Sequence, residues 1–338
     1  MASQARIAKW DNVKFVLILS VVLGHFLARY TSDSVNAKRL VFFIYLYHMP
    51  AFVFISGLFA KKTINEKRYD KMFGFLLLFL ITKYALFFIK VLRGAELSFS
   101  YLEMNDVSWY AFAIFVFCLE TVFFRRFDKK WMMVIVLLNA LAAGYATDID
   151  TYLSLSRLLT FYPFFLLGYY LEPAKIVEFT GKIQVKIGSA VLLLAAAVLC
   201  YVKIDTLYGY LEILKGKHGY AVLKECGNYG FWIRGGWYLA ALLLTMALIA
   251  VTPEIHSVFT TIGSRTMQIY ALHYIPMMVF FGNFKGKELI RNLTEAHQVP
   301  VVILLAFVTT CLLAIKPITV VINWLVSPKS IDFFKKVC

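Results

Sequence analysis

Long runs of apolar residues, separated by short polar segments, occupy most of the chain. A helix that crosses a bilayer needs about 20 mostly apolar residues. Ten segments fit this description, some of them short: residues 11–29, 40–60, 72–92, 108–124, 131–147, 157–171, 184–204, 233–251, 266–283 and 300–326. We therefore predict an all-α, polytopic membrane protein with about ten transmembrane helices.

The composition agrees with this pattern. Hydrophobic residues make up 61% of the chain and charged residues only 16%, whereas a soluble domain has about 45–50% and about 25%. The formal net charge of +15 would suit a nucleic-acid-binding protein, but the Lys and Arg residues gather in short segments between the apolar runs. That distribution is typical of cytoplasmic loops of membrane proteins, so we expect membrane lipids, and no nucleic acid, as partners.

The loops also predict an orientation. Successive loops lie on opposite sides of the membrane and so form two sets. One set carries 17 Lys and Arg, among them Arg6 and the tail residues Lys329, Lys335 and Lys336, and the other set carries 10. Cytoplasmic loops hold the excess of positive charge, so both termini are predicted to be cytoplasmic. The first apolar run lacks a small-residue cleavage site, which favours an uncleaved first span.

No segment resembles an appended soluble domain. The longest stretch between apolar runs, 205–232, is too short for one, so residues 1–338 are predicted to form a single transmembrane domain. The five cysteines include no CxxC spacing, and none of them is expected to bind a metal ion.

The first run, residues 10–30, is apolar yet contains Asp11, Lys14 and His25. Eleven helical residues turn through about three full turns, so Lys14 and His25 share one face. At about 1.5 Å per residue they stand roughly 16 Å apart along the axis. Ionisable groups inside a membrane are costly and usually face a cavity or a partner, which makes this face the leading candidate for a functional site.

Other polar residues lie in or beside later runs. His48 precedes Pro50, which interrupts the helical hydrogen bonding and permits a kink; a cavity role and a packing role are both open. Arg68 and Lys71, one turn apart at the start of the third run, suit either a phosphate-binding rim or ordinary positive-inside charge.

Three further residues are candidates for a substrate pocket: Arg157, Arg234 and His273. The two arginines lie near the predicted outer ends of their runs. They suit the recognition of an anionic or sugar substrate, or they anchor helix ends.

Histidines and cations at different depths suit acyl transfer through the apolar layer. A histidine accepts the proton of a hydroxyl while that oxygen attacks a thioester, and a lysine or arginine neutralises phosphates or a developing oxyanion. The same residues suit a proton-coupled transporter. The pattern alone leaves both open, and no P-loop, GxSxG or HExxH motif points elsewhere.

Four stretches carry a resemblance: DNVKFVLILSVVLGHF, YHMPAFVFISGLF, SRLLTFYPFFLLGYYL and IGSRTMQIYALHYIP. They are similar, in order, to motifs of the acyltransferase-3 family of integral-membrane acyltransferases. The greatest similarity is to the branch of fucose 4-O-acetylases and surface-polysaccharide O-acetyltransferases. The resemblance extends from residue 11 to about residue 275.

The resemblance implies a ten-helix membrane domain that takes acyl groups from acyl-CoA and modifies sugars of surface glycans. Lys14 and His25 match the family pattern of a basic residue, ten residues and a histidine. Arg68 and Lys71 match a basic pair that usually consists of two arginines, so Lys71 departs from the pattern.

The resulting hypothesis is a bacterial plasma (inner) membrane O-acetyltransferase that moves an acetyl group from acetyl-CoA to a cell-surface polysaccharide or its lipid-linked precursor. It assigns catalysis to His25, Lys14 and Asp11, donor binding to Lys14, Arg68 and Lys71, and the substrate pocket to His48, Arg157, Arg234 and His273. A transporter or flippase for a glycan lipid is the alternative, and assembly into a homo-oligomer is left open.

Overall fold

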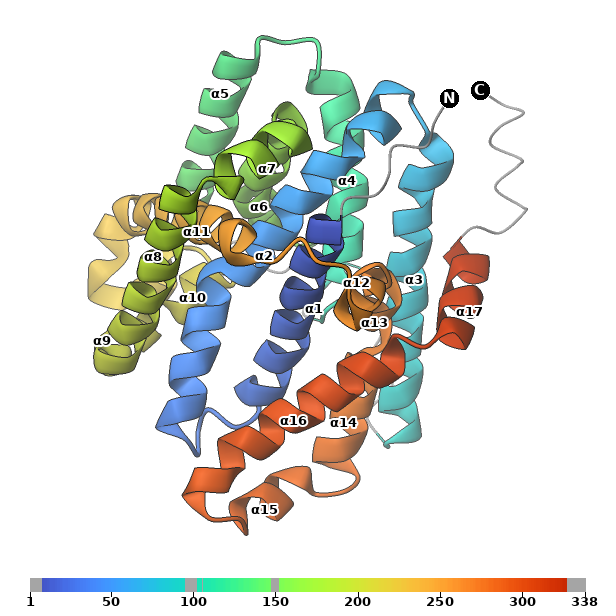
Figure 1. The fold of residues 1–338 in the computed structure, drawn as a ribbon, viewed down its shortest axis with the longest axis vertical. Coiled ribbons are helices and arrows are strands. Elements are labelled where there is room, and N and C mark those ends of the chain that lie inside the picture. The colour runs from blue at the N-terminus through green and yellow to red at the C-terminus, as the bar shows by residue number, and fades with distance from the viewer. Residues whose placement is uncertain (1–7, 95–101, 105, 147–151, 327–338) are drawn as a thin grey trace. The chain divides into compact units, whose positions relative to one another are not determined.

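A computed structural model describes residues 8–94, 102–104, 106–146 and 152–326 (Figure 1). These residues form helices and no β-strand, apart from one isolated bridge between Glu103 and Tyr152. The all-α prediction is therefore confirmed for this part of the chain. Arg6, Lys329, Lys335 and Lys336, which entered the orientation argument, lie outside the described residues.

The helices differ greatly in length. The longer ones are α1 (Ala8–Ala28), α2 (Val35–Asn65), α3 (Tyr69–Leu92), α4 (Trp109–Phe124), α5 (Lys129–Ala142), α6 (Leu155–Tyr170), α7 (Pro173–Gly181), α8 (Ile183–Val202), α11 (Gly230–Val251), α16 (Glu295–Leu313) and α17 (Lys316–Val326). The shorter ones are η1 (Ala143–Tyr145), α9 (Ile204–Leu207), η2 (Tyr208–Tyr210), α10 (Leu211–Leu214), η3 (Tyr220–Tyr229), α12 (Val258–Gly263), α13 (Thr266–Leu272), α14 (Tyr274–Gly282) and α15 (Gly286–Arg291).

Six of the described helices are long and apolar enough to cross a membrane. They are α1, α2, α3, α8, the helix that ends at Val251, and α16. A chain with several such helices is a multi-pass membrane protein. The total of about ten spans and the side on which the termini lie remain predictions.

Two predicted spans are each divided into two α-helices, and a proline explains each division. The segment 266–283 is divided into α13 and α14 at His273, because Pro276 has no N–H to donate to the carbonyl group of Leu272. The segment 300–326 is divided into α16 and α17. Here Pro317 has no N–H for the carbonyl group of Leu313.

The stretch 205–232, which was expected to be a loop, is also largely helical. Its centre is Tyr220, whose hydroxyl group donates to the carbonyl oxygen of Leu141 at 2.6 Å. A Cβ atom at Gly144 or at Gly230 would lie 2.2 or 2.1 Å from the Tyr220 ring, so glycines make room for the ring. The stretch therefore has a small core of its own.

The described helices belong to two compact units. The first contains Met1–Met49, Ala174–Leu207 and Leu242–Thr319, and the second contains Pro50–Pro173, Tyr208–Ala241 and Val320–Cys338. Each unit is described by itself below.

In the first unit α1 is the central helix. It packs against α12, α13, α14 and α16, and Figure 1 shows α1, α12 and α16 side by side. Leu17, Ile18 and Leu27 are fully buried. Lipid tails are as apolar as these side chains, so the close packing of the side chains, rather than their removal from water, holds the helices of this unit together.

A glycine allows α12 to approach α1 closely. A Cβ atom at Gly263 would lie 1.8 Å from the carbonyl oxygen of Asp11. Any other residue at position 263 would push the two backbones apart, so the position requires glycine. This contact lies beside the polar residues at the start of α1.

A charged cluster connects α15 to the turn between α1 and α2. Asp33 accepts hydrogen bonds from Lys287 at 2.7 Å and from Nε of Arg291 at 3.0 Å. These two cations hold the pKa of Asp33 well below its ordinary value. The carboxylate therefore stays ionised over the whole neutral and mildly acidic range.

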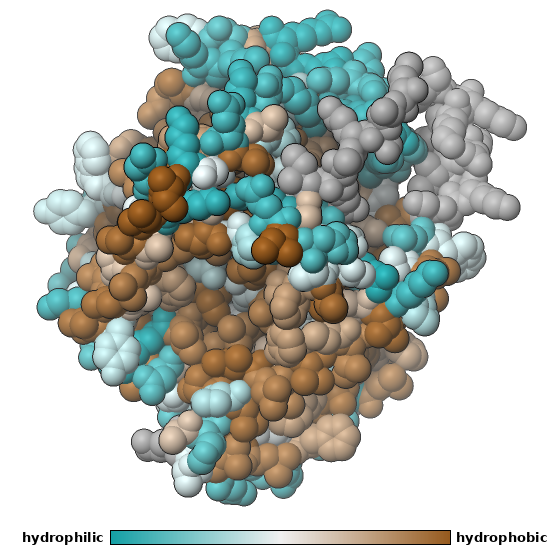
Figure 2. Space-filling model, viewed as in Figure 1, coloured by the Kyte–Doolittle hydropathy of each residue, from teal (hydrophilic) through white to brown (hydrophobic). Residues whose placement is uncertain are grey.

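The outer surface of α16 is apolar. Ile303, Leu304, Val308 and Leu312 are all exposed, and brown, hydrophobic atoms cover the corresponding part of Figure 2. An exposed apolar face of this length is expected to contact lipid tails rather than water.

In the second unit, α2 and α6 touch through two glycines. A Cβ atom at Gly57 would lie 2.0 Å from the carbonyl oxygen of Phe165, and one at Gly168 would lie 2.1 Å from that of Phe54. Small residues at such a crossing let two membrane helices pack backbone to backbone.

The contact at Gly263 gives a testable prediction. Replacement of Gly263 by Ala should lower the free energy of unfolding by about 2 kcal/mol or more, because the helices must separate to admit the methyl group. Thermal unfolding of the detergent-solubilised protein measures this. The matched control is Gly188→Ala on α8, where nothing lies within 4 Å of an added Cβ; that change should be neutral or stabilising by up to about 1 kcal/mol. Equal melting temperatures for the two variants would contradict the close contact.

Candidate active site

The first turns of α1 contain an ion pair. An Oδ atom of Asp11 lies 2.6 Å from Nζ of Lys14. The Asp11 side chain is buried, whereas the Lys14 side chain is 19% exposed. The carboxylate therefore offsets the cost of a partly buried ammonium group, and Lys14 retains access to a ligand.

Asn12 fixes this part of α1 to the segment before α12. Its amide nitrogen donates to the carbonyl oxygens of Pro253 and Ile255, both at 2.9 Å. Its amide oxygen accepts a hydrogen bond from Thr260 at 2.6 Å. Both amide hydrogens and the amide oxygen of Asn12 therefore have hydrogen-bond partners. These bonds hold the turn of α1 next to Asp11 against α12 and the segment before it.

A second contact supports the same segment. Lys9 is fully buried, and its Nζ lies 3.1 Å from a carboxylate oxygen of Glu254. A buried ammonium group needs such a partner. The positions of Lys9 and Asn12 in the sequence gave no indication of these roles, because their partners lie more than 240 residues away.

His25 lies near the other end of α1 and is partly exposed. The centroid of its ring is 5.2 Å from that of His273 and 5.7 Å from that of Tyr274, whose edge it meets. The structure thus brings together two histidines that were predicted separately, one for catalysis and one for the substrate pocket.

His273 stands at the break between α13 and α14, and its side chain is fully buried. Its Nδ1 atom lies 2.8 Å from the carbonyl oxygen of Tyr270 and 3.1 Å from that of Ile269. Carbonyl oxygens only accept hydrogen bonds, so Nδ1 carries the hydrogen. The other ring nitrogen, Nε2, is buried and has no hydrogen-bond partner.

Two residues that the sequence analysis missed complete the surroundings of His25. The guanidinium group of Arg29 donates to the hydroxyl oxygen of Tyr274 at 2.8 Å. Arg29 follows His25 by four residues, so the two share a helix face. That spacing was the available signal for Arg29.

His48 lies in the part of α2 that belongs to the same unit. Its Nδ1 is 2.9 Å from the carbonyl oxygen of Ile44, and its ring meets that of Tyr45 at 4.6 Å. An added Cβ at Gly24 would lie 3.3 Å from Tyr45, so Tyr45 packs against α1. This hydrogen bond lies within α2, whereas the packing alternative for His48 requires a bond to a neighbouring helix, so both alternatives stay open.

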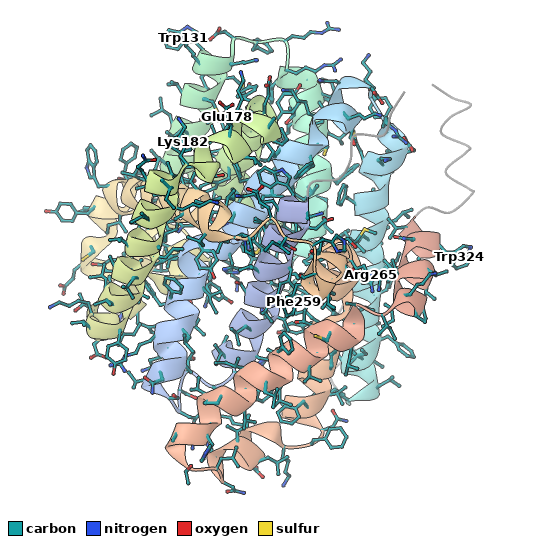
Figure 3. All side chains as sticks on the ribbon, viewed as in Figure 1. Trp131, Glu178, Lys182, Phe259, Arg265 and Trp324 are labelled. Carbon is teal, nitrogen blue, oxygen red and sulfur yellow. The ribbon has the colours of Figure 1, made fainter. Side chains whose placement is uncertain are left out.

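Arg265 and Gln268, which lie in the same stretch as His273, have a structural role. Gln268 donates to the carbonyl oxygen of Leu313 at 2.6 Å, and Arg265 donates to that of Ala314, also at 2.6 Å. These carbonyl groups lie at the end of α16, where Pro317 interrupts the helical hydrogen bonds. Figure 3 labels Arg265 beside Phe259 of α12, and Phe259 stacks on Phe15 at 4.6 Å.

In the second unit, Arg68 and Lys71 lie at the start of α3. Arg68 is 3.5 Å from Asp70, with both side chains about one-third exposed, and Lys71 is exposed. Exposed ion pairs of this kind contribute little to stability. The two cations are therefore accessible to a dissolved anion.

The two arginines predicted for the pocket are held by backbone carbonyl groups. Arg234 is fully buried; it donates to Ala140 at 3.1 Å and to His218 at 3.2 Å, and it lies over the Tyr220 ring. Arg157 donates to Met104 at 3.0 Å and lies over the Trp109 ring. These contacts support the anchoring alternative for both residues.

Comparison with known proteins adds an independent observation. The profile of a family described as an acyltransferase domain matches residues 7–315. The chain belongs to the acyltransferase-3 family. Together with its apolar helices, this makes the protein a membrane acyltransferase, and the resemblance seen in the four sequence stretches is confirmed.

A curated relative covers part of this acyltransferase. Nodulation protein NolL of Sinorhizobium fredii is 28% identical to it over 215 residues, which make up 58% of this chain and 56% of that protein. The chain thus spans little more than half the length of this relative. No solved structure matches the chain significantly.

Among the residues that the structure describes, no group of three or more His, Cys, Asp or Glu side chains is arranged to hold a metal ion. The candidate site in the first unit of the acyltransferase instead contains an ion pair, two histidines, a tyrosine and an arginine. This set supplies proton transfer and charge neutralisation.

The role of Asn12 is testable by an isosteric change. Asn12→Asp keeps the oxygen that accepts from Thr260 but replaces the amide donor with an acceptor that faces two carbonyl oxygens. The free energy of unfolding should fall by about 2 kcal/mol or more, as measured by thermal unfolding. Asn283→Asp, at an exposed position, is the control. If both variants melt at the wild-type temperature, the Asn12 contacts do not fasten the segment.

Proposed function

We propose that the protein transfers an acetyl group from acetyl-CoA, or a related acyl group from its acyl-CoA, to a sugar hydroxyl of a cell-surface polysaccharide or its lipid-linked precursor. Family membership supports the transfer of an acyl group. The observation that carries the proposal is α1 itself, which presents a partly exposed imidazole, His25, on the helix face that also bears the Asp11–Lys14 pair.

The reaction needs one base. His25 removes the proton of the sugar hydroxyl as its oxygen attacks the carbonyl carbon of the thioester. A new C–O bond forms, the C–S bond breaks, and the proton passes from His25 to the thiolate sulfur of the leaving CoA. Atoms and charge balance without a metal ion or a redox partner.

The donor requires cations. Acyl-CoA carries several phosphate charges and a long thiol-bearing arm. Lys14 is proposed to bind the donor, with Asp11 holding its ammonium group, and the accessible Arg68 and Lys71 are proposed to bind phosphate groups. The roughly 16 Å rise along α1 between Lys14 and His25 is the depth that the acyl-bearing arm would have to cover.

The acceptor requires a pocket beside His25. His273 is proposed to line this pocket, because its ring lies 5.2 Å from that of His25. His48, Arg157 and Arg234 are also proposed as pocket residues; in the protein without substrate each is bonded to a backbone carbonyl group. We further propose a single transmembrane domain in a bacterial inner membrane, with both termini in the cytoplasm.

Replacement of His25 tests the proposal. In purified protein supplied with labelled acetyl-CoA and a surface glycan, His25→Ala should reduce acetyl transfer by about 10²–10⁴-fold, the usual contribution of a general base. Lys14→Ala should chiefly raise the KM for acetyl-CoA. His297→Ala is the matched control, because His297 is exposed and its Nδ1 atom lies 2.6 Å from the hydroxyl oxygen of Thr294.

Unaltered transfer by a folded His25→Ala variant would remove His25 from the mechanism. A transporter or flippase for a glycan lipid predicts a different result. In that case mass spectrometry of the glycan from a deletion strain would show unchanged acetyl esters, and the purified protein would not bind acetyl-CoA.

A further inference from the structure

The buried ring of His273 has one nitrogen that the fold does not use. The backbone carbonyl groups of Ile269 and Tyr270 both lie within hydrogen-bond distance of Nδ1. Nδ1 must therefore be the protonated nitrogen of the neutral ring. Nε2 then carries a lone pair and accepts hydrogen bonds.

The local backbone sets this tautomer. Pro276 prevents the helix from continuing regularly through His273, and the last turn of α13 leaves the carbonyl groups of Ile269 and Tyr270 facing the imidazole. Because the tautomer is fixed by the main chain, the position of the Nε2 lone pair is also fixed.

This lone pair has no partner in the resting protein. The side chain is 0% exposed, and Nε2 makes no hydrogen bond. A buried acceptor without a partner costs about 1–3 kcal/mol. Such groups in native proteins call for an explanation, and a catalytic role is one of the recognised ones.

The ring of His25 is the neighbouring group that becomes a stronger hydrogen-bond donor during the proposed reaction, when it turns into an imidazolium. The two ring centroids are 5.2 Å apart, with 36° between the ring planes. Two imidazoles joined by an N–H···N hydrogen bond have centroids about 5 Å apart, given a bond of about 2.9 Å. The separation of the rings therefore suits this bond, which forms when the His25 ring turns toward the fixed Nε2 atom of His273.

We infer that Nε2 of His273 accepts a hydrogen bond from the N–H of His25 that lies on the ring nitrogen opposite the one that removes the proton of the acceptor hydroxyl. The inference rests on the proposed function. The proton stays on His25 until it passes to the CoA thiolate, and His273 remains neutral throughout. His273 is thus a positioning residue that stabilises the transient imidazolium.

Other side chains also pack near this end of α1. Tyr274 meets the His25 ring by its edge, Arg29 donates to the Tyr274 hydroxyl, and Tyr45 packs across Gly24. A neutral acceptor that faces the His25 ring stabilises an imidazolium formed there.

Two substitutions separate this role from a purely structural one. In His273→Asn the amide can still donate to the carbonyl groups of Ile269 and Tyr270, but the Nε2 acceptor is lost. In His273→Gln the longer side chain returns an acceptor near the position of Nε2. Thermal unfolding of both variants reports whether they fold.

The inference predicts that His273→Asn lowers kcat by about tenfold or more, the size of one hydrogen bond to a charged group. The acidic limb of its pH–rate profile should move to lower pH by about one unit, because the protonated form of His25 is less stabilised. His273→Gln should retain most of the activity and the wild-type limb. His297→Asn serves as the control.

The opposite order, with His273→Asn active at the wild-type pH profile and His273→Gln impaired, would show a structural role and overturn the inference. If the wild-type protein transfers acetyl groups in the same assay, the proposed function is supported even when the inference about His273 is overturned. Absence of transfer by the wild type, with acetyl-CoA unbound, would instead defeat the proposed function.

A measurement on the wild-type protein covers the case in which neither variant folds. Histidine labelled with ¹⁵N reports the tautomer of each ring. Nδ1–H on His273, with an Nε2 signal that moves as His25 is protonated, supports the inference. Nε2–H on His273, or an Nε2 signal insensitive to His25, overturns it.

Discussion

The cost of placing polar atoms inside an apolar helix bundle governs this structure. The helix α1 is mostly buried, yet it carries Lys9, Asp11, Asn12 and Lys14 within its first two turns. Each of these side chains has a partner: Glu254 for Lys9, Lys14 for Asp11, and Pro253, Ile255 and Thr260 for Asn12. The pairing of these groups positions α12 and the segment before it against the proposed donor-binding end of α1.

In the same unit, prolines leave backbone carbonyl groups without their helical donors, and polar side chains bind carbonyl groups nearby. Pro317 leaves the end of α16 without its normal donors, and Gln268 and Arg265 supply donors from α13. Pro276 leaves the carbonyl group of Leu272 without its helical donor. The imidazole of His273 lies against the carbonyl groups of Ile269 and Tyr270, one turn earlier. Backbone irregularity inside a membrane is tolerated where such side chains satisfy it.

Much of the fold was visible in the sequence. The apolar runs predicted an all-helical, multi-pass protein because a bilayer demands long apolar helices. The spacing of Lys14 and His25 predicted a shared face on α1, since helical periodicity alone determines it. The motifs that resembled the acyltransferase-3 family pointed to the family that the comparison then confirmed.

Other features depend on contacts that no local pattern contains. His25 and His273 are 248 residues apart in the chain, so their proximity follows only from the packing of α1 against α13 and α14. The stretch 205–232 was expected to be a loop, yet Tyr220 packs against Gly230 of the same stretch and against the distant Gly144, and the stretch has a core. Arg234 was predicted for a pocket because it lies near the predicted outer end of its run, where it would suit an anionic or sugar substrate, but its guanidinium group is bonded to two carbonyl oxygens.

The central claim is that α1 delivers a thioester-borne acyl group to His25. An experimental structure with a non-hydrolysable acetyl-CoA analogue tests it most directly. The account predicts the acyl carbonyl carbon within about 4 Å of a ring nitrogen of His25 and CoA oxygen atoms bonded to Lys14. An acyl group bound elsewhere, or a His25 ring that faces lipid without a path to the donor, would contradict it.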